Sequence, residues 1–82
     1  MTNLEKYHKI LKRDLGAKDE DLNDEVLAYN RFKRWESVAH IDMVSDLEAA
    51  FSVTFDTLDI TSFNTYSKGI EILEGLGVDM SK

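Results

Sequence analysis

The sequence contains no cysteine and no proline, and none of its apolar runs approaches the length of a membrane span. Without cysteine the chain forms neither disulfide bonds nor thiolate metal sites, so any thiol chemistry must come from an attached group. A helix that spans a bilayer needs about 20 apolar residues, and residues 1–6 also lack the apolar core of a signal peptide. We therefore expect no membrane insertion and a cytoplasmic location.

The 82 residues are 43% hydrophobic and carry a net charge of −6, which is typical of one small folded domain, here residues 1–82. The negative charge repels the phosphates of nucleic acids and favours basic protein partners. We expect a monomer that does not bind nucleic acid. A domain of this size buries a modest core but no deep catalytic cleft, so we do not expect an enzyme.

The N-terminal segment has the pattern of an amphipathic helix. Thr2 and Glu5 have the spacing of a capping box, and Gly16 offers a stop. Between them, apolar residues recur at helical intervals: Leu4, Tyr7, Leu11 and Leu15. Residues 17–30 are mostly polar and predict a long loop. Apolar residues are expected to pin this loop to the core: Leu22, Val26, Leu27, Tyr29 and Phe32.

A second amphipathic helix is predicted from Ser37 to Phe51. At about 100° per residue, one side of this helix carries the core candidates His40, Val44, Leu47 and Phe51. The other side carries Val38, Asp42, Ser45 and Asp46. An isolated exposed apolar residue such as Val38 is common, but beside a serine and acids it also suits a partner-docking face, and both interpretations stay open. Trp35 is expected to anchor the preceding loop in the core.

The remaining residues predict two more helices. Residues 52–55 are expected to be an extended loop, and residues 56–63 hold enough apolar side chains for one short helix. Thr65 then caps a last helix, which ends at Gly75 or Gly77 and has Tyr66, Ile70 and Leu73 as core candidates. Residues 78–82 are expected to be a tail. The sequence thus predicts an all-α bundle of three main helices plus one short helix, with a long first loop.

Ser37 is the candidate reactive residue. A serine at a helix start has two interpretations. Its hydroxyl can cap the first turn of the helix. The same position also suits a phosphate, because unpartnered N–H groups and a partial positive charge lie there. A catalytic pair of Ser37 with His40 is disfavoured, because the chain has no glycine-rich elbow and no enclosed site for an oxyanion hole.

No metal site is predicted. Asp19, Asp21 and Asn23 match the first ligand positions of a calcium loop, but Asp24 and Asn30 stand where that loop needs glycine and glutamate. His8 and His40 are far apart in the sequence, and neither has a partner histidine nearby.

Three segments together resemble the acyl carrier proteins: Glu36-Ser37-Val38, Leu47-Glu48-Ala49-Ala50-Phe51, and Thr65 before the last apolar helix. In that family Asp-Ser-Leu opens helix II, Leu-Glu-x-x-Phe closes it, and a threonine precedes the last helix. The resemblance covers nearly the whole chain. It departs at Glu36 and Val38, which replace aspartate and leucine while keeping charge and apolarity.

The resemblance implies an acyl-carrier-type bundle with 4'-phosphopantetheine from coenzyme A attached to Ser37, whose thiol holds acyl or aminoacyl groups as thioesters. The implied partners are a phosphopantetheinyl transferase and acyl- or aminoacyl-transferring enzymes, such as those of fatty acid or polyketide biosynthesis. Residues 36–67 hold six acids and neither Lys nor Arg. This charge pattern favours docking to basic enzyme surfaces. The expected docking residues are Glu36, Val38, Asp42 and Asp46.

Two features of the sequence allow more than one interpretation. The alternative function is a non-catalytic, acidic helical interaction module in which Ser37 only caps a helix. The cluster Arg31, Lys33 and Arg34 places positive charge shortly before Ser37. It indicates either a specialised free-standing carrier that repels general enzymes or simply solvated loop charges.

Overall fold

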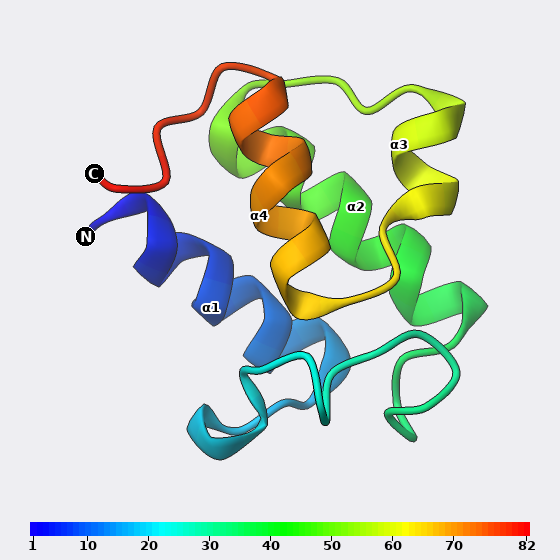
Figure 1. The fold of residues 1–82 in the computed structure, drawn as a ribbon. Coiled ribbons are helices and arrows are strands. Elements are labelled where there is room, and N and C mark those ends of the chain that lie inside the picture. The colour runs from blue at the N-terminus through cyan, green and yellow to red at the C-terminus, as the bar shows by residue number, and fades with distance from the viewer.

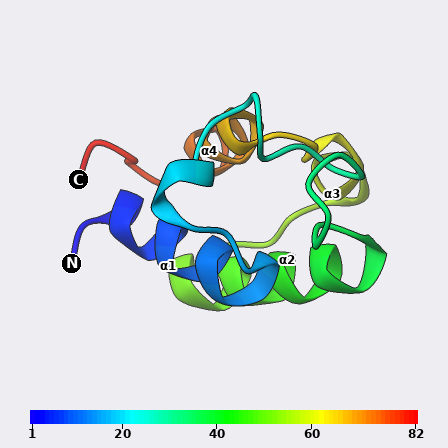
Figure 2. The same ribbon diagram turned by 90° about the horizontal axis from the view of Figure 1, so that it is seen from below.

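The computed structural model describes all 82 residues and consists of four α-helices and one 3₁₀ turn (Figure 1). The elements are α1 (Asn3–Leu15), η1 (Asp19–Asp21), α2 (Ser37–Phe51), α3 (Thr57–Ser62) and α4 (Tyr66–Gly75). The helices α1 and α2 form one layer, and α3, α4 and part of the first loop form the other (Figure 2). The all-α prediction of three main helices, one short helix and a long first loop is confirmed.

Helix α1 begins and ends where the sequence predicts. The Thr2 hydroxyl accepts a hydrogen bond from the Glu5 N–H, and the Glu5 carboxylate accepts one from the Thr2 N–H. Gly16 ends the helix with φ 69°, in the left-handed region that glycine adopts without a steric penalty from Cβ. The side chain of Arg34 lies against Gly16, so a positive charge stands at the negative end of the α1 dipole.

The first loop is held to the core by apolar side chains. Leu27 is fully buried, while Leu22, Tyr29 and Phe32 are half-buried against the core. The prediction for Val26 is wrong, because its side chain is 37% exposed. The Asn23 side chain accepts a hydrogen bond from the Val26 N–H, and this local turn leaves Val26 on the outside of the loop.

The same loop supplies partners for the start of α4. Leu27 accepts a backbone hydrogen bond from Tyr66, and the Asp24 carboxylate accepts from both the N–H and the hydroxyl of Ser67. Thr65 caps the helix through its hydroxyl, as predicted. The N–H groups that a helix start leaves unpartnered are therefore satisfied here.

The core is one cluster of fifteen buried apolar side chains between the two layers. On α2 the predicted His40, Val44 and Leu47 are buried and Phe51 is half-buried, but Met43 is buried as well. On α4 Leu73 is buried, Tyr66 and Ile70 are half-buried, and Ile72 joins the core unpredicted. Trp35, with 1% of its surface exposed, anchors the loop before α2 as expected.

Residues 78–82 pack against the bundle, so the expectation of a simple tail is wrong. After α4, Gly77 takes φ 95° and the Val78 N–H donates back to the Leu73 carbonyl, which is the hydrogen bond of a Schellman motif. Met80 is then buried. The Asn3 amide donates to the Asp79 carbonyl over 2.9 Å, so the two ends of the chain lie side by side (Figure 1).

At Gly69, α4 packs closely against the core. A Cβ atom at this position would overlap the Tyr7 hydroxyl and the Phe63 ring. The Tyr7 hydroxyl donates to the Tyr66 carbonyl over 2.6 Å, so this side chain is not free to move aside. The glycine is therefore required by packing rather than by backbone angle.

We predict that Gly69→Ala lowers the free energy of unfolding by about 1–3 kcal/mol, because an added methyl group overpacks the core. Gly75→Ala is the matched control, since a Cβ there meets nothing within 4 Å and alanine favours a helix by about 1 kcal/mol. Urea unfolding followed by circular dichroism measures both variants. Equal stability of the two would contradict the close approach at Gly69.

Candidate functional site

Ser37 is exposed and is the first residue of α2. The N-cap position belongs to Glu36, whose side chain makes no capping hydrogen bond. The Ser37 hydroxyl oxygen lies 3.1 Å from the hydroxyl of Tyr29. The interpretation of Ser37 as a helix cap is therefore wrong, because the helix begins at Ser37 rather than after it.

The first turn of α2 has unpartnered backbone donors. The earliest backbone hydrogen bond at this end runs from the His40 N–H to the Glu36 carbonyl over 2.8 Å. The N–H groups of Ser37, Val38 and Ala39 donate to no protein group. Together with the positive end of the helix dipole, these donors favour an anion near Ser37.

A hydrogen-bond chain through His40 fixes this end of α2. The Trp35 indole donates to His40 Nδ1 over 3.0 Å, and His40 Nε2 lies 2.8 Å from the Ile60 carbonyl of α3. An indole N–H only donates and a carbonyl only accepts, so His40 carries its proton on Nε2. Trp35 and His40 are 1% and 8% exposed. We call this chain the Trp35–His40–Ile60 clamp.

Tyr29 joins the clamp to Ser37. Its ring meets Trp35 and His40 edge to face, with centroids 6.3 Å and 5.3 Å away. Both ring nitrogens of His40 bond to other groups, so neither is directed at the Ser37 hydroxyl. The sequence pattern assigned Tyr29 only to loop packing, and no spacing signal links it to Ser37 eight residues later.

Beside Ser37 lies an exposed surface that is apolar at its centre and acidic around it. Val38 and Ile41 are 68% and 55% exposed, and residues three apart share a helix face. Glu36 and Asp42 are exposed on the same end of α2. We call these four residues the Val38 face. The contribution of Ile41 was not predicted.

Asp46 does not belong to the Val38 face. At 100° per residue it lies about 80° round the helix from Val38, and this rotation turns it toward α1. Its carboxylate is 3.1 Å from the guanidinium of Arg13. Of the four expected docking residues, the structure keeps Glu36, Val38 and Asp42 together and pairs Asp46 within the bundle.

Asp14 lies beside this ion pair. One of its carboxyl oxygens is buried and accepts no hydrogen bond. Burial and the neighbouring Asp46 raise the pKa of Asp14 to about 6, against a smaller opposing effect of Arg13. Asp14 and Arg13 in turn lower the pKa of Asp46. Below about pH 6 the two carboxyl groups therefore share one proton, which is held on Asp14.

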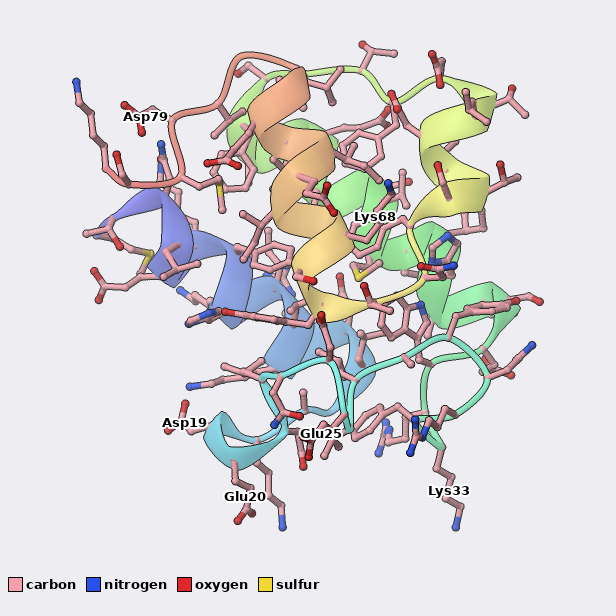
Figure 3. The ribbon with its side chains drawn as sticks, in the orientation of Figure 1. Asp19, Glu20, Glu25, Lys33, Lys68 and Asp79 are labelled. Atoms are coloured by element: carbon pink, nitrogen blue, oxygen red, sulfur yellow. The ribbon has the colours of Figure 1, made fainter.

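The basic cluster before Ser37 is divided by the fold. Arg31, Lys33 and Arg34 are all exposed, but the Arg34 side chain packs on Gly16 at the end of α1. Lys33 points away from the protein into solvent (Figure 3). Arg34 therefore has a structural contact, whereas the ammonium group of Lys33 is free to meet a partner.

No group of three or more His, Cys, Asp or Glu side chains is arranged to hold a metal ion. In the segment that resembles part of a calcium loop, Asp19 pairs with Lys12 and Asp21 accepts from the Lys18 N–H. None of the helices has both the length and the apolar character needed to cross a membrane.

Comparison with known proteins gave no match to a protein-family model, to a curated protein sequence or to a solved structure. The acyl-carrier resemblance is a resemblance of sequence motifs, among which Glu36-Ser37-Val38 stands at the start of α2.

We predict that stability falls as the pH rises through about 6, because the pKa of folded Asp14 lies above its ordinary value of 3.8. The stability that the protonated carboxyl contributes is complete below about pH 4 and is lost by about pH 7. Asp14→Asn keeps an uncharged donor beside Asp46 and removes this loss. Urea unfolding of both proteins at pH 4 and pH 7.5 measures it. If the wild type and Asp14→Asn show the same change in the free energy of unfolding between pH 4 and pH 7.5, the raised pKa of Asp14 is contradicted.

Proposed function

We propose that this protein is a carrier in which Ser37 bears a 4'-phosphopantetheine group and presents acyl or aminoacyl cargo to partner enzymes. The observation that carries the proposal is the exposed Ser37 hydroxyl on the first turn of α2, within the triplet Glu36-Ser37-Val38. The attached group would supply the thiol that forms thioesters, which the chain lacks because it has no cysteine.

The surroundings of Ser37 fit a phosphodiester. Three N–H groups, those of Ser37, Val38 and Ala39, are free to face an anion. An anion at a helix start gains about 0.3–1 kcal/mol from the dipole. The Tyr29 hydroxyl, 3.1 Å from Ser37 Oγ, is a further donor. The Trp35–His40–Ile60 clamp holds this turn in place while the attached arm moves.

The Val38 face supports docking to enzymes. Its exposed apolar residues Val38 and Ile41 are bordered by the acids Glu36 and Asp42. Protein interfaces combine an apolar centre with a polar rim, and charge complementarity mainly raises the association rate. A basic rim around an apolar depression on the partner enzyme would match this surface.

A second candidate is an acidic interaction module that binds one fixed basic partner through the same Val38 face. It explains the exposed Val38 and Ile41, but it gives no role to the accessible Ser37 hydroxyl. The two functions differ in whether Ser37 is modified.

We predict that coenzyme A and a broad-specificity phosphopantetheinyl transferase add one phosphopantetheine to the protein, seen by intact mass spectrometry. Ser37→Ala should remove the adduct and keep the fold, because the lost hydrogen bond to Tyr29 is worth only about 1 kcal/mol. Ser45→Ala, at another exposed serine of α2, is the matched control and should be modified normally.

Two outcomes would count against the carrier. An adduct that persists in Ser37→Ala would place the modification elsewhere. A folded wild-type protein that takes no adduct would favour the interaction module.

We also predict that Asp42→Lys slows transfer onto Ser37 by about tenfold at low salt, because charge near the contact surface acts on the association rate. Glu74→Lys is the control, since exposed Glu74 lies near the end of α4, distant from the start of α2 (Figure 1). Transfer rates at low and physiological ionic strength measure the effect. Equal slowing by both variants, or transfer rates that do not depend on ionic strength, would exclude electrostatic docking through the Val38 face.

A further inference from the structure

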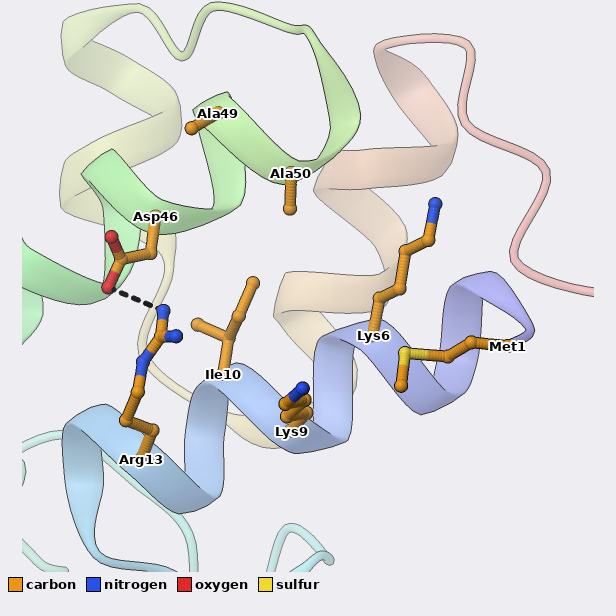
Figure 4. A pocket seen from close by; sticks show the side chains of 8 residues that line it. All are labelled: Met1, Lys6, Lys9, Ile10, Arg13, Asp46, Ala49 and Ala50. Carbon is orange, nitrogen blue, oxygen red and sulfur yellow. Dashed lines mark ion pairs between the residues drawn. The ribbon is translucent and has the colours of Figure 1, made fainter.

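A groove of about 400 Å³ lies between α1 and the C-terminal half of α2 (Figure 4). Ile10 is buried at its base, and Ala49 and Ala50 are exposed on its α2 wall. The side chains of these alanines are too short to reach across to α1, and this leaves the space open. Ala49 is twelve residues beyond Ser37, or about 18 Å along the helix axis, so the groove is separate from the Ser37 site.

The α1 edge of the groove is basic. Lys6, Lys9 and Arg13 line it, and their spacing of three and four residues puts them on one helix face over about 10 Å. Arg13 pairs with Asp46, whereas Lys6 and Lys9 form no ion pair. The Lys6 ammonium lies 5.9 Å from the centre of the Phe51 ring. Two unpaired cations thus line this groove in a chain of net charge −6.

We propose that this groove docks an acidic amphipathic helix of a partner protein. Acids three or four residues apart on such a helix repeat at the same interval as the cations of α1. Its apolar side would lie over Ile10, Ala49 and Ala50, as in other helix-in-groove complexes. A small carboxylate would engage only one of Lys6 and Lys9 and leave the other without a partner.

The net charge of the chain argues against other anionic occupants. Nucleic acids and anionic membranes present extended negative surfaces, which a protein of net charge −6 repels. A narrow helix would approach the basic edge of α1 without meeting the acids at the start of α2. Binding in the groove does not depend on modification of Ser37, so the unmodified protein is the right sample.

The test uses a synthetic helical peptide with glutamates at positions i, i+4 and i+7 beside a leucine face, titrated into ¹⁵N-labelled protein. Amide shifts should centre on Lys6, Ile10 and Ala50. The double variant Lys6→Gln with Lys9→Gln should weaken binding about tenfold, or about 1.4 kcal/mol. Lys18→Gln with Lys33→Gln removes the same charge from exposed loop positions and should leave binding nearly unchanged.

A second variant tests the apolar part of the groove. Ala50→Phe fills the groove at an exposed position and should weaken peptide binding without changing any charge. Four results would overturn the proposal: no binding at millimolar peptide, equal weakening by the two double variants, shifts confined to the Val38 face, or unaltered binding by Ala50→Phe. Tighter binding of phosphatidylserine vesicles or of a short RNA duplex than of the peptide would also overturn it.

Discussion

The Trp35–His40–Ile60 clamp is the interaction on which the geometry at Ser37 depends. It joins the loop before α2, the first turn of α2 and the helix α3 through two hydrogen bonds to one imidazole ring. Trp35 and His40 are almost fully buried, where an unpaired donor costs about 1–3 kcal/mol. The clamp therefore ties the first turn of α2 to α3, and Tyr29, packed on both rings, brings its hydroxyl to Ser37.

Local signals in the sequence were enough to predict most of the helices and their ends. The capping residues Thr2, Glu5 and Thr65 and the stop at Gly16 act within one helical turn, so the structure confirms them. The buried Met80 was missed because a five-residue segment has no periodicity, and its position depends on contacts with distant residues.

The candidate site was predictable only in part, for the same reason. The start of α2 at Ser37 and the inward direction of His40 follow from helical periodicity. Tyr29 lies beside Ser37 because the first loop packs on the core, and this long-range packing has no local sequence signal. The ion pair of Asp46 with Arg13 on α1 was not predictable, because a pattern confined to α2 does not contain α1.

The surfaces at the two ends of α2 carry opposite charges. The acids of the Val38 face surround Ser37, whereas Lys6, Lys9 and Arg13 of α1 border the groove at the other end. Partners of opposite charge would thus bind at separate places.

The central claim is that the clamp holds a turn whose free N–H groups receive a phosphodiester on Ser37. Amide spectra of ¹⁵N-labelled protein before and after phosphopantetheine transfer test it most directly. We predict the largest shifts at Ser37, Val38 and Ala39, with the Trp35 indole signal unmoved. Shifts concentrated elsewhere, or a displaced Trp35 signal, would contradict it.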